Sequence, residues 1–191
     1  MKLTYAITTL ALATGIVADC PPQQRIDHLK FIVDAFNAKG AASLEGINNL
    51  PLAPECDAFL FINGLPGIQP GTFSGDTVKV FAQTVRQVFG YVEGRYSTAD
   101  NSTGTLDAIV TLGAAQNVLL PIKTRIVVPA EFNPDTCLIT ELPTYITIPI
   151  DIAGNPINPP IIPAIPGLDR LPGLSTIIDM LPPAIRSSLG L

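Results

Sequence analysis

The chain has 191 residues, of which 47% are hydrophobic and 14% are charged. It is therefore long enough for one domain with a substantial core, and too apolar to be an acidic disordered protein. Its formal net charge is −5, and no run of Lys or Arg could follow a phosphate backbone, so no nucleic-acid partner is expected.

The first 18 residues have the pattern of a secretory signal peptide. Lys2 precedes an uncharged, mostly apolar run that ends in small side chains at Ala18, and Asp19 follows. This run is shorter than the roughly 20 residues needed to cross a bilayer as a helix. We therefore expect a secreted, extracellular protein with no stable membrane span.

Secretion permits disulfide bonds, and the chain has three cysteines, Cys20, Cys56 and Cys137. One intramolecular bridge can form, and we expect Cys137 to pair with either Cys20 or Cys56, which leaves one thiol unpaired. Zinc is not expected, because the cysteines are far apart in sequence and His28 is the only histidine. No motif for another metal or cofactor is present.

Apolar residues at helical spacing predict helices over 23–39, 41–49 and 74–89. The last of these has the clearest pattern, with apolar side chains on one side and polar ones on the other. We expect Ser74 to cap its start and Gly90 to end it. This long helix should cover one face of a sheet.

A compact apolar run that lies between Pro54 and Gly64 predicts a strand over 57–63. After the long helix the hydrophobic period changes from 3.6 to 2, which is typical of strands. The strands predicted there cover 91–97, 105–112, 118–128, 136–141 and 145–152, with a turn over 129–135, a bulge or edge at Pro121 and a break at Pro143. Within 105–112, alternation places Leu106, Ala108, Val110 and Leu112 on one face and Asp107 on the other. The polar loop after 91–97 holds Asn101-Ser102-Thr103, an acceptor sequence for N-glycosylation at Asn101.

The composition changes after residue 153. Residues 155–191 contain eight prolines in units such as Pro-Ile-Ile-Pro, which argues against a conventional packed domain. We divide the chain into a signal peptide (1–18), an α+β domain (19–153) and a Pro-rich apolar tail (154–191). Because the tail is apolar, we expect it to lie against the domain, a partner or a membrane surface.

The predicted order of elements resembles the cone-shaped α+β fold of the NTF2-like superfamily and its SnoaL-like branch, here in a secreted eukaryotic member. The resemblance is carried by Phe31-Ile-Val-Asp-Ala-Phe-Asn-Ala-Lys39, by Ala58-Phe-Leu-Phe-Ile62, and by Gly71-Thr-Phe-Ser-Gly75 leading into the long helix. It implies a curved antiparallel sheet wrapped around about three N-terminal helices, with an apolar pocket open at one end. Candidates to line that pocket are Phe59, Phe61, Phe81, Tyr96, Val110 and Ile122.

Enzymes of this superfamily, such as ketosteroid isomerases and polyketide cyclases, place carboxylates and tyrosines in the pocket for proton transfer. Such chemistry needs an acid in apolar surroundings, where loss of solvation raises its pKa. Alternation places Asp107 towards solvent, while Glu141 and Asp57 fall at strand ends, so we assign no catalytic residue.

The sequence therefore predicts a non-enzymatic protein that binds a small apolar ligand or a protein partner through its pocket or sheet face. The sheet face also offers a surface for a homodimer. One alternative is a SnoaL-like isomerase, cyclase or dehydratase that uses a pocket carboxylate and a Tyr. Another is association with a surface or membrane through the Pro/Ile-rich tail.

Overall fold

The computed structural model describes residues 20–67, 69, 74–114, 118–149, 151–152 and 155–156. The predicted signal peptide and nearly all of the Pro-rich tail lie outside this part of the chain. The helical elements are α1 (Pro22–Asn37), α2 (Gly40–Asn48), α3 (Gly75–Val85) and the short 3-10 helix η1 (Arg86–Val88). The strands are β1 (Leu52–Ile62), β2 (Phe89–Thr98), β3 (Thr103–Ala114), β4 (Val118–Phe132), β5 (Ile139–Thr147), β6 (Asp151–Ile152) and β7 (Asn155–Pro156).

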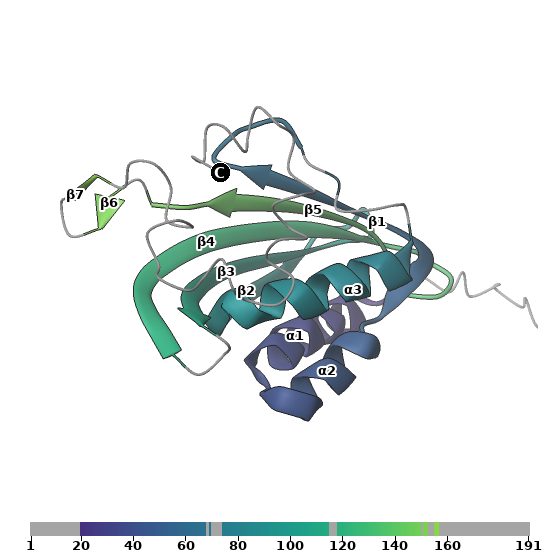
Figure 1. Cartoon of the computed structure of the whole chain (residues 1–191). Helices are drawn as coiled ribbons and strands as arrows, with labels where there is room; N and C mark the ends of the chain where they lie inside the picture. The colour runs from purple at the N-terminus through teal and green to yellow at the C-terminus, as the bar shows by residue number, and fades with distance from the viewer. Residues whose placement is uncertain are drawn as a thin grey trace, which may run out of the picture.

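Five strands form one sheet in the order β1-β5-β4-β3-β2. It curves towards the three helices, which all lie on the same side (Figure 1). We call that side the inner face and the opposite side the outer face. The α+β cone predicted from the sequence is confirmed, with one correction: the sheet is mixed, because β1 runs parallel to β5 while the other neighbours are antiparallel.

Helix α3 begins as its sequence predicts and ends earlier. Ser74 Oγ accepts a hydrogen bond of 3.2 Å from the backbone N–H of Thr77, which caps the helix. The predicted stop at Gly90 is wrong, because Phe89 already pairs with Leu112 as the first residue of β2. The last turn of the predicted helix is instead the 3-10 helix η1, and only Phe89 of that prediction joins the sheet.

A glycine seats the start of α3 against β1. A Cβ atom added to Gly75 would lie 2.5 Å from the carbonyl oxygen of Ala53, closer than any real side chain approaches. The backbone of the helix can therefore approach the strand only because this position has no side chain.

Strands β1, β4 and β5 run through prolines that were predicted to end or break them. Pro54 lies in β1 where the pairing with β5 shifts register. Pro129 and Pro143 fall in a gap of the β4–β5 ladder, between the pairs Val127/Tyr145 and Glu131/Glu141. Neither proline can donate a backbone hydrogen bond, so the ladder loses no donor of theirs by being interrupted at this gap. A register irregularity of β4 between Leu119 and Lys123 includes Pro121, where a bulge was expected.

The core lies between the inner face and the helices. Leu106, Ala108 and Val110 are buried there, as the alternation of β3 predicted, and so are Ile126 and Val128 of β4. They pack in one cluster with Leu29 and Val33 of α1 and Ile47 of α2.

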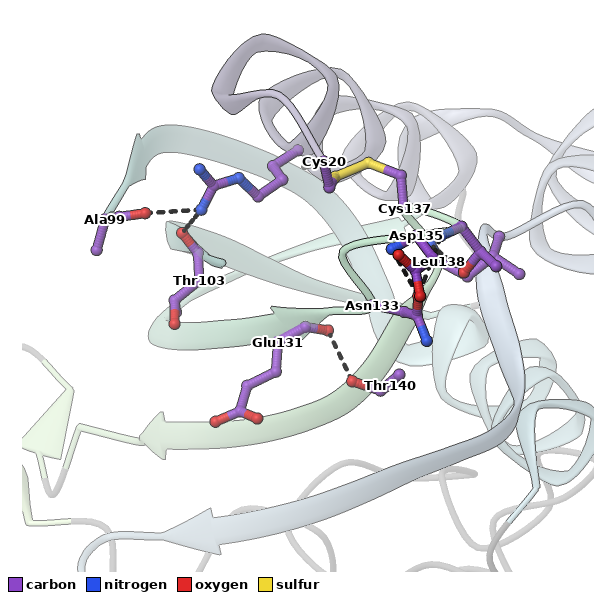
Figure 2. The surroundings of a disulfide bond; sticks show 11 residues. Cys20, Ala99, Thr103, Glu131, Asn133, Asp135, Cys137, Leu138 and Thr140 are labelled. Carbon is purple, nitrogen blue, oxygen red and sulfur yellow. Dashed lines mark hydrogen bonds between the residues drawn. A yellow bond between two sulfur atoms is a disulfide. The ribbon is translucent and has the colours of Figure 1, made fainter. Parts of the chain in front are cut away.

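A disulfide bond joins Cys20, just before α1, to Cys137 in the turn between β4 and β5 (Figure 2). This is one of the two pairings that the sequence left open, and Cys56 is the unpaired, buried cysteine. In the same turn Asn133 Oδ1 accepts hydrogen bonds from the backbone N–H groups of Asp135 and Thr136, at 2.9 and 3.0 Å. The bridge thus ties the first helix to a well-bonded turn.

Arg25 fastens the neighbouring β2–β3 loop, at the same end of the sheet, to α1. It is only 4% exposed, and its Nη1 donates to the backbone carbonyls of Ala99 and Thr103 at 2.7 and 2.8 Å. Both acceptors flank the β2–β3 loop (Figure 2), and Asn101 is exposed in that loop.

Asn37, the last residue of α1, closes part of the free edge of β2. Its Nδ2 donates to the carbonyl of Val92 at 2.9 Å, and its Oδ1 accepts from the N–H of Val92 at 2.8 Å. The carboxamide therefore occupies the position that another strand would take. Among the described helices, none is long and apolar enough to cross a membrane.

Candidate functional site

The inner face carries a row of isoleucines that runs across three strands. Ile126 of β4 pairs with Ile146 of β5, which pairs with Ile62 of β1. Ile126 is buried, whereas Ile146 and Ile62 are only half-buried. Along this row, burial therefore decreases from β4 towards β1.

Further half-buried apolar side chains continue this region. Leu112 and Phe89 pair at the β3–β2 end, and the ring of Phe89 packs on that of Phe36 with centroids 5.2 Å apart. We call the region the inner apolar surface; it comprises Leu60, Ile62, Phe89, Leu112, Ile126 and Ile146. Only apolar groups make up this set, so it favours contact with apolar molecules.

Thr124 places one hydroxyl on the inner face. It precedes Ile126 by two residues on β4 and pairs with Val110, so it shares the inner face with both. The residue is 3% exposed, and its Oγ1 has no hydrogen-bond partner. Leaving a buried hydroxyl unpaired costs about 1–3 kcal/mol, so this atom favours any polar group that can reach it.

The pocket candidates from the sequence divide between the two faces. Val110 and Tyr96 belong to the inner face, where Val110 is 1% exposed and Tyr96 packs against the core. Phe81 is half-buried on α3. The side chain of Ile122 lies outside the described residues.

Phe59 and Phe61, by contrast, lie on the outer face, contrary to expectation. Phe61 pairs with Tyr145 and that residue with Val127, while the neighbouring Ile62 belongs to the inner row. The run Ala58 to Ile62 is apolar at every position, so its sequence contains no alternation that could tell one face from the other.

The strand carboxylates also avoid the inner face. Asp107 lies on the outer face, as predicted, and pairs with Arg125 through contacts of 2.8 and 2.9 Å. The hydrogen bond from Arg125 holds the pKa of Asp107 below its ordinary value. Asp57, Glu141 and Glu131 pair in one row across β1, β5 and β4 on the outer face. These four carboxylates therefore lie on the side of the sheet away from the helices.

Tyr96 and His28 both have shifted pKa values, and neither forms an acid–base pair with a described residue. Burial, and to a lesser extent Asp34, raises the pKa of Tyr96, but Asp34 itself is exposed on α1. Burial lowers the pKa of His28, whose ring stacks on Phe132 with centroids 6.2 Å apart. Within the described ranges no group of His, Cys, Asp and Glu could hold a metal ion.

Thr124 was the informative residue that sequence reasoning did not single out. Its signal was present, because it is the polar member of an alternating apolar series in β4. Alternation showed which face it would take, but the absence of a hydrogen-bond partner depends on the neighbouring strands and helices.

No protein-family model matches this chain, and a sequence comparison with curated proteins finds no match either. Several solved structures resemble it in fold. An NTF-2-like protein of unknown function from Burkholderia xenovorans is 10% identical, with a TM-score of 0.49 over 70% of this chain and 91% of that one.

A candidate SnoaL-like polyketide cyclase from Jannaschia Sp. is 9% identical, with a TM-score of 0.46 over 65% of this chain and 86% of that one. A steroid delta-isomerase from Pseudomonas aeruginosa is 13% identical, with a TM-score of 0.45 over 64% and 78% of the two chains. These likenesses concern the fold alone. The element order and the sheet topology are those of an NTF2-like α+β cone, as the sequence predicted.

Proposed function

We propose that this protein is a secreted, non-enzymatic binding protein for a small, mainly apolar molecule, which it takes up at the inner apolar surface. The observation that carries the proposal is the combination of half-buried Leu60, Ile62 and Ile146 with the unpaired hydroxyl of Thr124. Apolar contact supplies the affinity, and the hydroxyl orients one polar group of the ligand.

The free energies expected from apolar contact and from one hydrogen bond are consistent with ligand binding at this surface. A ligand that removes about 200 Å² of apolar surface from water gains about 5 kcal/mol, at roughly 25 cal/mol per Å². A hydrogen bond to a hydroxyl that is otherwise unpaired adds about 1–3 kcal/mol, because it removes an existing penalty. Together they amount to about 6–8 kcal/mol, which corresponds to micromolar dissociation constants at best, because the entropy cost of association is subtracted from this sum.

A SnoaL-like isomerase, cyclase or dehydratase is the alternative. It needs a carboxylate in apolar surroundings beside the substrate, where burial would raise its pKa enough for proton transfer at neutral pH. The strand carboxylates on the described part of the chain lie on the outer face instead. This arrangement favours binding over catalysis.

Native mass spectrometry of the full-length secreted protein tests the proposal. We expect a bound small molecule that is released unchanged on denaturation and identified as largely apolar. Purified protein that carries no such mass, and that binds no apolar fluorescent probe, would contradict binding. A released molecule that differs from the one added, with turnover, would support the enzyme.

Thr124→Val provides the matched variant, because valine has nearly the same shape and lacks the hydroxyl. We expect ligand affinity to fall about tenfold, while the free energy of unfolding stays equal or rises because the unpaired hydroxyl is gone. Thr111→Val is the control, since Thr111 lies on the outer face as the pair of Lys123. Equal affinity in both variants would remove Thr124 from the site.

A further inference from the structure

The outer face of the sheet carries an apolar surface that none of the described helices covers (Figure 1). Its centre is a stack of Phe61 on Tyr145, with ring centroids 4.8 Å apart and planes at 14°. Tyr145 is 46% exposed. Around this stack lie further apolar side chains that are exposed or half-buried: Phe59, Ile109, Val127, Pro129 and Pro143. We call this set the outer apolar surface.

A row of carboxylates borders the outer apolar surface. It consists of Asp57, Glu141 and Glu131, which pair across β1, β5 and β4. Oδ1 of Asp57 is buried and has no hydrogen-bond partner. The row lies four residues from Tyr145 along β5, or about 13 Å at 3.3 Å per residue. An occupant of this face therefore meets an aromatic region first and a negative region next to it.

The chain that follows β5 forms a short pair of antiparallel strands. Strands β6 and β7 lie beyond the C-terminal end of β5 (Figure 1). They pair antiparallel, with Asp151 opposite Pro156 and Ile152 opposite Asn155, so the chain reverses its direction here. Residues 157–191 follow β7 directly along the chain.

These residues also match the outer face in chemistry and length. They contain Pro159-Pro-Ile-Ile-Pro163 and Ile165-Pro-Gly-Leu168, followed by Asp169 and Arg170. Proline-rich segments bind preferentially to surfaces lined by aromatic rings, since their extended conformation loses little entropy on binding. At about 3.1 Å per residue, the ten or so residues around these prolines span roughly 30 Å, which is enough to cross the aromatic region and reach the carboxylates.

We propose that residues 159–170 dock on the outer apolar surface of their own chain, with the prolines against Phe61 and Tyr145 and Arg170 at the carboxylate row. Because residue 159 follows Tyr145 by only 14 residues in the same chain, even weak contacts suffice for high occupancy, as the effective concentration is in the millimolar range. The proposal is independent of ligand binding at the inner face.

Tethering favours the tail over a second copy of the chain as the occupant. A second copy must reach the outer face from free solution, whereas residue 159 lies only three residues beyond β7 in the same chain. The segment also carries Arg170, which can pair with the exposed Glu131 of the carboxylate row.

Limited trypsin digestion of the full-length secreted protein tests the docking. Cleavage after Arg170 requires the tail to leave the surface, so its rate follows the fraction of undocked molecules. We expect Tyr145→Ala to raise this rate about tenfold, because an aromatic contact is lost. Tyr91→Ala is the control, since Tyr91 is an exposed outer-face tyrosine on β2, at the far edge of the sheet.

A second variant confines the change to the tail. Pro163→Ser cannot disturb the sheet, and it should raise the cleavage rate several-fold while the urea midpoint of the domain stays near that of wild type. Equal cleavage rates in wild type, Tyr145→Ala and Pro163→Ser would overturn the proposal. Protection that increases with protein concentration would overturn it as well, because it would identify a second copy as the occupant.

Discussion

Removal of the disulfide bond gives the most direct quantitative test of the fold. The bridge closes a loop whose ends are 117 residues apart in sequence. In the chain-entropy treatment, such a cross-link lowers the entropy of the unfolded chain by about 16 cal/mol/K, which is about 5 kcal/mol at 25 °C. Residual structure in the unfolded chain reduces this value, so we expect a loss of about 3–5 kcal/mol.

The variant for this test is Cys20→Ala with Cys137→Ala. Both cysteines are buried, at 3% and 4% exposure, so alanine is preferable to serine because it adds no buried hydroxyl. Cys56→Ala is the matched control: Cys56 is a buried cysteine that closes no loop, and its replacement should lose about 1 kcal/mol of packing.

Urea unfolding followed by circular dichroism measures the difference. With a slope of about 2 kcal/mol per molar urea, the double variant should unfold at a urea concentration roughly 2 M lower than wild type. A reducing agent should lower the midpoint of wild type and leave that of the double variant unchanged. If the double variant loses no more stability than Cys56→Ala, the bridge does not act through loop closure.

Three further predictions concern single side chains. Burial, with Asp57, Glu55 and Glu141 nearby, raises the pKa of the Cys56 thiol to about 12. Iodoacetamide at about pH 8 should therefore label this thiol only as the protein unfolds. Labelling at the rate of a free thiol would contradict its burial. Asn37→Ala should lower the free energy of unfolding by about 1–3 kcal/mol in urea titrations, because both backbone groups of Val92 lose their partner. An unchanged free energy of unfolding would mean that water replaces the carboxamide. The Asp107–Arg125 pair should add a small stability at pH values above the ordinary carboxyl pKa, and this stability should disappear as the pH falls through the lowered pKa of Asp107. The free energies of unfolding of Asp107→Asn and wild type should therefore become equal in acid. A difference between them that persists at about pH 2 would assign the effect to packing.

Local pattern was sufficient to predict much of the fold. Helical spacing located α1, α2 and α3 to within a few residues, and alternation in β3 assigned Asp107 and Val110 to the correct faces. These features depend on neighbours along the chain, which the sequence displays directly.

The remaining features depend on contacts between distant segments. Spacing could not decide whether Cys20 or Cys56 meets Cys137, because both pairings close a long loop. Nor could it show that Pro129 and Pro143 share one gap in the ladder, since that depends on the register of β4 against β5. The sequence also could not show on which face of the sheet Phe59 and Phe61 lie, because every position around them is apolar.

The parallel pairing of β1 with β5 has a consequence for synthesis of the chain. Strand β1 is made early, yet its only neighbour in the sheet is the last of the five strands to leave the ribosome. Until then its apolar run has no ladder to join, and it must be kept from other chains by helices or chaperones. This contact closes late and joins residues 84 to 87 positions apart, from Ile62 with Ile146 to Leu52 with Ile139, so it should be a slow step in folding.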